Sequence, residues 1–406
     1  MSLSVVRCFL VAGALLAAVV FGPRASAGDP LAVDIDFVSG SGVAVIDQEA
    51  RSIRLDPTPH KDRGWACWWY IKVSGLTIGE KLTLDVGEAP WATPNCAAVS
   101  DDNKTWAQTS PGQRAGKRIV YAHKATANEQ WFAWGPPFTP NDGEALVKDV
   151  ATRCKGAEAF ELCRSREDRP VWAIRFTPPA KRNADEVRYG LWVQARQHAW
   201  ESGASWVGRG FLEWLASDDD RATRLRTVAT ITFVPVMDVD NVARGAGGKN
   251  EVPQDHNRDW TDSPNHPAVA AAQEQIKAMN AASEFDLFID LHNPGANAKN
   301  PFFYTSPRKL LTERGARNLD HFLAAAQADM TGPLAFKGET QESGEKYDKN
   351  WRAISKNWVG MHTAGHVVAV TLETAWNTPD STQDGYQSVG KQLGCAVERY
   401  LRASPR

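Results

Sequence analysis

From about residue 144 to the end of the chain, strand-like and helix-like segments alternate. Short apolar runs predict buried strands over residues 171–176, 189–195, 228–237, 285–291 and 367–373. Amphipathic segments predict helices over residues 203–216, 267–282, 308–330 and 386–401. This alternation is typical of an α/β sheet covered by helices on both faces. Ligands of such sheets bind beyond the carboxyl ends of the strands, so we expect the site residues there.

The preceding part of the chain has a different pattern. Between residues 31 and 135, short runs of strand-forming residues are separated by Gly, Pro, Asn and Asp, which predicts an all-β sandwich. This pattern ends at residues 135–137 and 140–143, where Gly, Pro, Asn and Asp disfavour strands. We therefore expect a β-sandwich domain over residues 28–139 and a second domain over residues 140–406.

Residues 1–27 resemble a secretory signal peptide. Arg7 supplies a positive start, residues 9–21 form an apolar run, and Ala25-Ser26-Ala27 is a small-residue cleavage site. The run is short for a membrane span, although an uncleaved anchor is the alternative. We expect a mature chain that begins near Gly28, is secreted or periplasmic, and has no stable membrane insertion after cleavage.

Composition narrows the class of partner. The formal net charge is −2 and charged residues make up 23% of the chain, so the chain as a whole carries no strong basic field for nucleic acid. We expect specificity to come from a local site.

Export permits disulfides. Once the signal is removed, five cysteines remain, and Cys154 with Cys163, and Cys67 with Cys96, are candidate pairs. Cys395 would then be free or differently paired, because sequence does not fix connectivity.

Polar side chains of metal-binding type follow the expected strands. His198 and Glu201 come just after the strand 189–195, and His292 follows the strand 285–291. Two His and one Glu, with one open position, form a usual ligand set of catalytic zinc. Glu373, a carboxylate suited to proton transfer, ends the strand 367–373. The three candidate ligands thus predict a Zn²⁺ site, although a His and a Glu three residues apart also occur where Glu begins a helix.

A polar loop after the strand 228–237 contains a second candidate group. Asn257 and Arg258 suit a peptide's terminal carboxylate, because guanidinium binds carboxylates with two parallel hydrogen bonds. A charged surface loop is the alternative. We interpret His256 as a residue that packs the loop or supports the site from outside, rather than as a ligand. Asp290, two residues before His292, would orient a ligand or shape the turn.

Together these segments resemble the funnelin zinc carboxypeptidases, and most closely their cytosolic-carboxypeptidase-like subgroup. The resemblance is carried by the order and spacing of five motifs, each weak alone: residues 195–206, 238–242, 256–260, 290–292 and 371–373. Residues 69–75 and 131–139 are similar to the subgroup's β-sandwich module. The resemblance implies a zinc carboxypeptidase fold, a mixed sheet flanked by helices and preceded by an all-β sandwich.

The resemblance also implies roles for the site residues. Zn²⁺ would be held by His198, Glu201 and His292, with Glu373 as the general base. Asn257 and Arg258 would anchor the carboxylate of a peptide or protein C-terminus.

Two departures from the family pattern stand out. Ala199-Trp200 replaces the usual Pro-Gly, which predicts that Trp200 narrows the cleft or stacks within it. Gly248 stands where the family has an Arg that polarises the scissile carbonyl, so Lys249 and Arg244 are candidates for that role.

The family's mobile tyrosine has no assigned counterpart in the sequence. Trp351 and Trp358 lie in its region, and Tyr347 lies further from Glu373. Two alternatives to a carboxypeptidase therefore stay open: a weak or inactive binding protein with the same fold, and an amidase or deacylase of cell-wall peptides.

Overall fold

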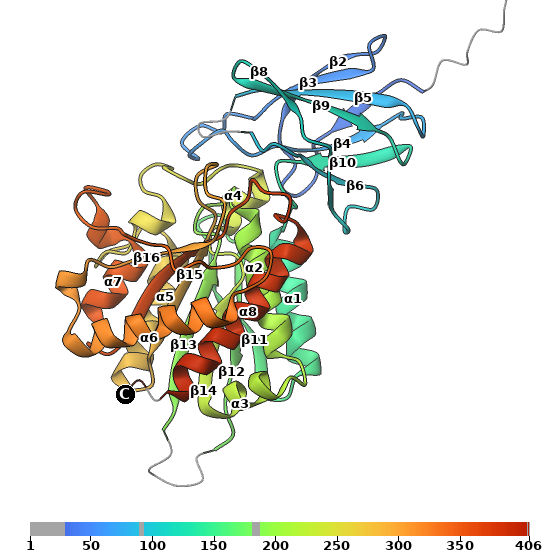
Figure 1. Ribbon diagram of the computed structural model, residues 1–406. Helices are drawn as coiled ribbons and strands as arrows, with labels where there is room; N and C mark the ends of the chain where they lie inside the picture. The colour runs from blue at the N-terminus through green and yellow to red at the C-terminus, as the bar shows by residue number, and fades with distance from the viewer. Residues whose placement is uncertain (1–28, 89–92, 181–186, 404, 406) are drawn as a thin grey trace, which may run out of the picture.

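The computed structural model describes residues 29–88, 93–180, 187–403 and 405 (Figure 1). The predicted signal peptide lies outside the described residues. In the described part, no helix is long and apolar enough to cross a membrane.

Two β-sheets form the N-terminal part of the described chain. One has the strand order β1-β4-β10-β6-β7 and the other β2-β3-β5-β9-β8. Buried side chains from both sheets, among them Ile71, Tyr121 and Phe132, form one hydrophobic core, as a sandwich requires. The strands of the first sheet are β1 (Ala32–Asp34), β4 (Tyr70–Ser74), β6 (Ala98–Ser100), β7 (Ala107–Gln108) and β10 (Glu129–Ala133). Those of the second are β2 (Val43–Asp47), β3 (Ser52–Asp56), β5 (Lys81–Val86), β8 (Gln113–Ala115) and β9 (Arg118–Lys124).

The rest of the chain is built on a mixed sheet. Its order among the described residues is β11-β12-β14-β13-β15-β18-β16-β17. The four central strands are parallel, namely β13 (Tyr189–Ala195), β14 (Ala229–Val234), β15 (Leu287–His292) and β18 (Val368–Glu373). The outer strands are β11 (Ala157–Arg164), β12 (Pro170–Phe176), β16 (Phe302–Thr305) and β17 (Thr340–Glu342). Strands β13 and β15 are buried along their whole length, as expected for strands covered on both faces.

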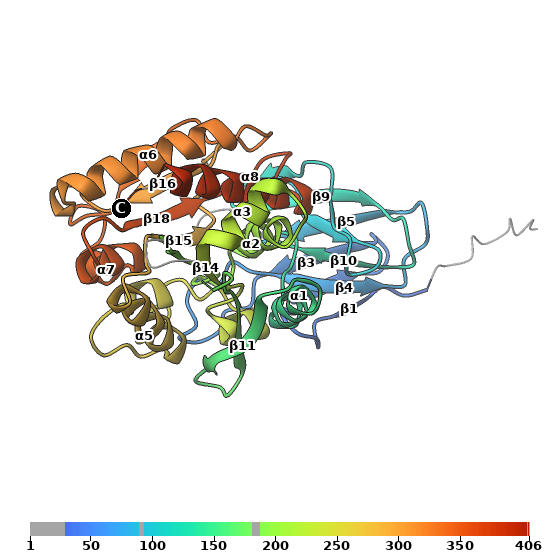
Figure 2. The same cartoon turned by 90° about the horizontal axis from the view of Figure 1, so that it is seen from below.

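Helices cover both faces of this sheet (Figure 2). One face carries α2 (Ser202–Leu215), α6 (Glu313–Asp329) and α8 (Gln383–Arg402), and the other carries α5 (Pro267–Ala281) and α7 (Ser355–His362). Helix α1 (Pro140–Arg153) packs against β11 and β12. The remaining helices are α3 (Asp220–Val228), α4 (Val239–Arg244) and the 3₁₀ turns η1 (His256–Arg258), η2 (Arg308–Leu310) and η3 (Trp351–Ala353).

The α/β fold with a preceding β-sandwich is confirmed, whereas several bounds differ. The strand expected over 228–237 ends at Val234, because Asp238 already caps α4. The helix expected over 308–330 is interrupted, because Thr312 caps a new helix that begins at Glu313. The boundary at 139/140 stays a prediction; α1 begins at Pro140, capped by Thr139.

The cysteine pairs expected from the sequence are not formed. Cys67, Cys96, Cys154, Cys163 and Cys395 are all free thiols in the described chain. Cys67 is instead packed within the core of the sandwich, and Cys154 within the core of the α/β sheet.

The sandwich lies beside the carboxyl ends of the parallel strands (Figure 1). Trp200, which follows β13, and Trp376, which follows β18, are buried in the hydrophobic core of the sandwich. Trp134 packs against both, with ring centroids 5.1 Å from Trp200 and 4.4 Å from Trp376. The sandwich is therefore joined to the segments that carry the candidate site residues.

Candidate active site

A tight turn between β13 and α2 positions the first two candidate ligands. Arg196 adopts a left-handed backbone conformation (φ +64°), and its buried guanidinium donates to the carbonyl oxygens of Ala199 and Phe138. These bonds hold the turn closed around His198. Glu201 follows as the N-cap residue of α2, where the positive end of the helix favours a carboxylate.

The three predicted ligands converge at one point. Nδ1 of His198 lies 2.8 Å from Oε1 of Glu201, and Nδ1 of His292 lies 2.7 Å from Oε2. All three residues are buried, and one donor atom from each lies within 4.8 Å of the others. Although burial opposes it, the two imidazoles hold the pKa of Glu201 well below its ordinary value. Glu201 is therefore an ionised carboxylate.

Each of the two histidines has a carboxylate near its Nε2 atom, on the side of the ring away from Glu201. Nε2 of His292 lies 3.0 Å from Asp290, and Nε2 of His198 lies 3.6 Å from Asp255. Carboxylates in such positions fix the ring orientation and leave the other nitrogen free to bind a metal. Asp290 is itself held by Gln197 and by the hydroxyl of Ser355. Of its two proposed roles, the structure thus supports that of orienting a ligand.

This donor set fits zinc. Two imidazole nitrogens and one carboxylate oxygen from three separate side chains face one buried point, and both Nδ1 atoms are turned toward it. His198, Glu201 and His292 are thus the residues that could hold the ion.

Glu373 lies next to the candidate metal site. It is paired with His292 across β15 and β18, and its Oε2 is buried without a hydrogen-bond partner in the described chain. Burial raises the pKa of Glu373 to about 8, against the opposing charge of His292. A carboxyl group whose pKa lies near neutrality can both accept and return a proton.

Glu373, Asn257, Arg258 and Lys249 line the same pocket as His198 and His292, which encloses about 280 Å³. Arg258 donates to Asp348 (2.8 Å) and to the carbonyl oxygen of Asn257 (2.8 Å). These contacts hold a buried guanidinium at the wall of the pocket.

The structure distinguishes between Lys249 and Arg244, the two candidates to replace the arginine that polarises the scissile carbonyl in the family. Nζ of Lys249 lies in the pocket, 3.3 Å from Nε2 of His198. Arg244 is not among the lining residues; its Nε donates to both oxygens of Glu167 (2.7 and 2.9 Å). Trp200 does not narrow the cleft either, because its ring is packed into the sandwich core.

The lining also includes Tyr304, Ser343 and Lys356, to which the sequence analysis gave no role. Tyr347 joins them, with its ring 5.9 Å from the guanidinium carbon of Arg258. It thus reaches the pocket although it lies 26 positions before Glu373 in sequence. Lys356 is the second residue of α7 and is fully buried, and its Nζ donates to Asn357 (2.9 Å) and to Ser343. Burial lowers the pKa of Lys356 to about 7.

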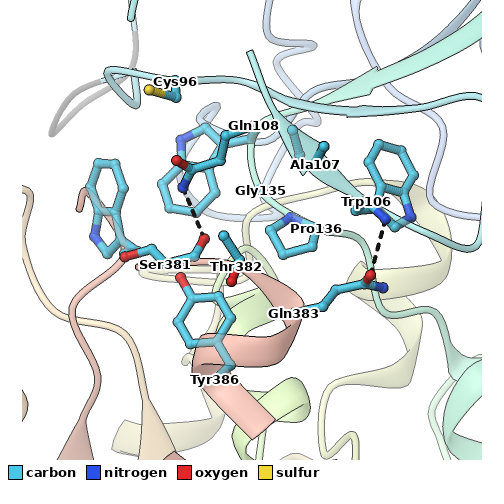
Figure 3. A pocket seen from close by; sticks show the side chains of 13 residues that line it. Cys96, Trp106, Ala107, Gln108, Gly135, Pro136, Ser381, Thr382, Gln383 and Tyr386 are labelled. Carbon is cyan, nitrogen blue, oxygen red and sulfur yellow. Dashed lines mark hydrogen bonds between the residues drawn. The ribbon is translucent and has the colours of Figure 1, made fainter. Parts of the chain in front are cut away.

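A second pocket, of about 360 Å³, lies between the sandwich and the start of α8 (Figure 3). Gln108 donates to the carbonyl oxygen of Ser381 (3.2 Å), and the backbone amide of Trp106 donates to Gln383 (3.0 Å). None of the candidate site residues lines it. Because its polar groups bond to each other across the gap, we interpret it as a junction between the two parts of the chain.

Comparisons with known proteins agree with this geometry. Residues 144–393 match the family model described as zinc carboxypeptidase. The chain is 26% identical over 266 residues to an uncharacterised protein of Zymomonas mobilis (63% of this chain, 66% of that protein). It is 23% identical over 266 residues to cytosolic carboxypeptidase 2 of Danio rerio (58% of this chain, 37% of that protein). The chain thus spans less than two thirds of the length of these curated relatives.

Solved structures with the same fold cover nearly the whole chain. A metallo-carboxypeptidase from Burkholderia cenocepacia has a TM-score of 0.79 at 21% identity, covering 92% of this chain and 99% of that one. A metallo-carboxypeptidase from Pseudomonas aeruginosa in complex with (2-guanidinoethylmercapto)succinic acid has a TM-score of 0.77 at 23% identity, covering 92% and 100%. At these identities the likeness shows the fold.

Proposed function

Because the chain belongs to the zinc carboxypeptidase family, we propose that it is a metallocarboxypeptidase that removes residues from peptide or protein C-termini. The observation that carries this proposal is the convergence of His198, Glu201 and His292 beside Glu373 and Arg258 in one pocket. A pure binding protein has no need for an unpaired buried carboxylate beside a metal site.

His198, Glu201 and His292 would hold the zinc. The ion, when bound, supplies Lewis acidity and lowers the pKa of a water molecule. Glu373 accepts a proton from the attacking water and returns it to the leaving amine. Its unpartnered Oε2 is free for this exchange.

Arg258 and Asn257 bind the terminal carboxylate of the substrate. A guanidinium matches a carboxylate with parallel hydrogen bonds, and this anchor places the last peptide bond beside Glu373. Lys249 acts as a point charge that stabilises the negative charge developing on the carbonyl oxygen, the role for which the family uses Arg. Its Nζ already lies within the pocket beside His198.

Lys356 suits an acidic side chain on the C-terminal residue. It is a buried amine that lines the pocket, no ion pair to it is formed within the described residues, and the amine bonds only to neutral oxygens. A substrate carboxylate would supply the missing counter-charge and restore the protonated amine. A neutral or basic side chain would not supply this counter-charge. We therefore assign Asp or Glu as the preferred C-terminal residue.

The test is C-terminal trimming of a peptide library, followed by mass spectrometry. We expect loss of single residues from the C-terminus, abolition of this activity by a chelator, and recovery on addition of zinc. Peptides with an amidated C-terminus should resist, because they lack the carboxylate that Arg258 binds. Cleavage within the peptides, or equal cleavage of amidated ones, would contradict the proposal.

We also propose that the chain acts outside the cytoplasm, on the basis of the signal-like pattern of residues 1–27. Peptides of the envelope or surroundings would then be its substrates. N-terminal sequencing of the protein from its native cells should give a start near Gly28; a start at Met1 would remove this proposal.

A further inference from the structure

A second group of metal-binding side chains lies outside the pocket described above. Glu251, His256 and His266 are all buried, and one donor atom from each lies within 4.8 Å of the others. They come from the loop between α4 and α5: Glu251 follows α4, His256 begins η1, and His266 is the N-cap residue of α5. The mechanism proposed above uses none of the three.

The distances between the donor atoms suit tetrahedral coordination. Oε1 of Glu251 lies 3.3 Å from Nδ1 of His256 and 3.1 Å from Nε2 of His266. Ligand bonds of about 2.0–2.1 Å place neighbouring donors of a tetrahedral zinc about 3.3 Å apart. Asp238 lies beside this group, with Oδ2 3.7 Å from Nδ1 of His256, and water would take the fourth position at the ion.

Two of these donor atoms lack a hydrogen bond, although they lie within ion-pair distance of each other. Oε1 of Glu251 and Nδ1 of His256 are buried and form no hydrogen bond in the described chain. The other oxygen of Glu251, Oε2, accepts from Asn241 (2.8 Å), which leaves Oε1 directed at the two imidazoles. Unsatisfied buried carboxylate and imidazole atoms are costly, and a bound cation would satisfy both.

The charge of the cluster also suits a divalent cation. Asp238 and Glu251 bring two carboxylates together in a buried place, with Asn241 donating to both. The nearest arginine contact is Nη2 of Arg166, 4.0 Å from Oε2 of Glu251, on the oxygen that faces away from the imidazoles. A cavity of about 190 Å³, lined by Asp238, His256 and His266, adjoins the cluster and has room for water.

We propose that Glu251, His256 and His266 bind a second divalent metal ion of the zinc type, which has a structural role. The ion ties the segment that follows α4 to the start of α5. The loop between them carries Lys249, Asn257 and Arg258, so the ion fixes the residues that anchor the substrate.

Binding requires two local adjustments. Nε2 of His266 lies 2.8 Å from the carbonyl oxygen of Gln254 and must exchange that contact for the ion. The rings of His256 and His266 are stacked with centroids 3.7 Å apart at 23°, and must tilt to direct both nitrogens at one centre. Both changes are side-chain rotations within a loop.

The test counts metal ions in the tag-free full-length chain. After removal of metal and dialysis against zinc, elemental analysis should give two ions per chain, and cobalt titration should saturate at two equivalents. A single equivalent in the wild-type chain overturns the proposal. The metal count does not depend on peptidase activity. A count of one ion would therefore leave the proposed function intact, and a lack of peptidase activity would leave the second metal site intact.

Variants assign the ions to their sites. His266→Asn and Glu251→Gln should each lower the count from two to one, while His292→Asn should lose the other ion. His321→Asn, at an exposed position on α6, is the matched control and should keep both. Retention of two ions by both His266→Asn and Glu251→Gln would overturn the assignment, even where the wild-type chain binds two.

Discussion

The backbone amide of Trp65 in the sandwich donates a hydrogen bond of 2.9 Å to the carbonyl oxygen of Lys249 beside the candidate metal site. Two further bonds of this kind run beside it, from Gly248 to Arg63 and from Val252 to Asp62, each 2.9 Å. The sandwich therefore holds the backbone of the loop that carries the proposed oxyanion-stabilising lysine.

Gly64→Ala should disturb this contact and lower kcat/KM on the order of 10- to 100-fold, since small displacements of catalytic groups have effects of this size. A Cβ at Gly64 (φ +81°) would lie 2.3 Å from the carbonyl oxygen of Lys249, so the loop must move. Gly116→Ala is the control: its φ is also positive (+64°), but a Cβ there meets nothing within 4 Å. Equal activity of the two variants would show that the contact between the sandwich and this loop does not affect catalysis.

Glu373→Gln should lower kcat by about 10²- to 10⁴-fold, because an amide cannot accept the proton of the attacking water. The variant keeps the size of the side chain and leaves His198, Glu201 and His292 in place. Steady-state kinetics together with zinc analysis provides the check. Unchanged zinc content with full activity would exclude Glu373 from the mechanism.

Lys356→Met should remove the preference for acidic C-termini. We expect the wild-type enzyme to cleave a peptide ending in Glu at least about 10-fold more efficiently than its Gln counterpart, the size of one charge-assisted hydrogen bond. Methionine keeps the length of the side chain without the charge, so cleavage of the Gln peptide should change little. A wild-type enzyme that does not distinguish the two peptides would contradict this assignment.

Asp329→Asn should destabilise the fold at pH 7 by about 1–3 kcal/mol, as expected for the loss of charged hydrogen bonds. Asp329 accepts paired bonds from both Arg221 and Arg399, and although burial opposes it, these arginines lower its pKa to about 2. The ordinary pKa is higher, so the stabilisation is complete above about pH 4 and is lost as the pH falls toward 2.

Urea unfolding at pH 7 and at pH 3 checks this pH dependence. The difference in the free energy of unfolding between the variant and the wild type should be smaller at pH 3. Asp320→Asn is the matched control, because Asp320 and its partner Arg308 are each 52% exposed and such pairs contribute about 0–1 kcal/mol. A difference in the free energy of unfolding that increases toward pH 3 would show that the folded protein does not keep Asp329 ionised.

The sequence placed several candidate site residues at the ends of predicted strands. His292 and Glu373 were expected at strand ends, and the structure shows that these two strands are parallel neighbours. The choice between Lys249 and Arg244 could not be made in this way, because both lie in or beside an irregular loop whose path depends on contacts with the sandwich.

Lys356 was missed for a different reason. A lysine at the start of a short helix normally indicates solvent exposure, and nothing in the local pattern signals that this one is buried. Tyr347 was set aside on sequence distance, yet the segment between it and Glu373 contains η3 and α7, which return the chain to the pocket. Such positions follow from tertiary packing rather than from spacing.

The indole cluster of Trp134, Trp200 and Trp376 has a consequence for how the molecule melts. Trp200 directly precedes Glu201, and Trp376 lies three residues beyond Glu373, so loosening of the sandwich would pull on both carboxylates. Heating should accordingly give one cooperative transition, in which loss of catalysis coincides with the change in tryptophan fluorescence. A fragment that lacks the sandwich would expose the indoles of Trp200 and Trp376 to water. Such a fragment should aggregate and should not be active.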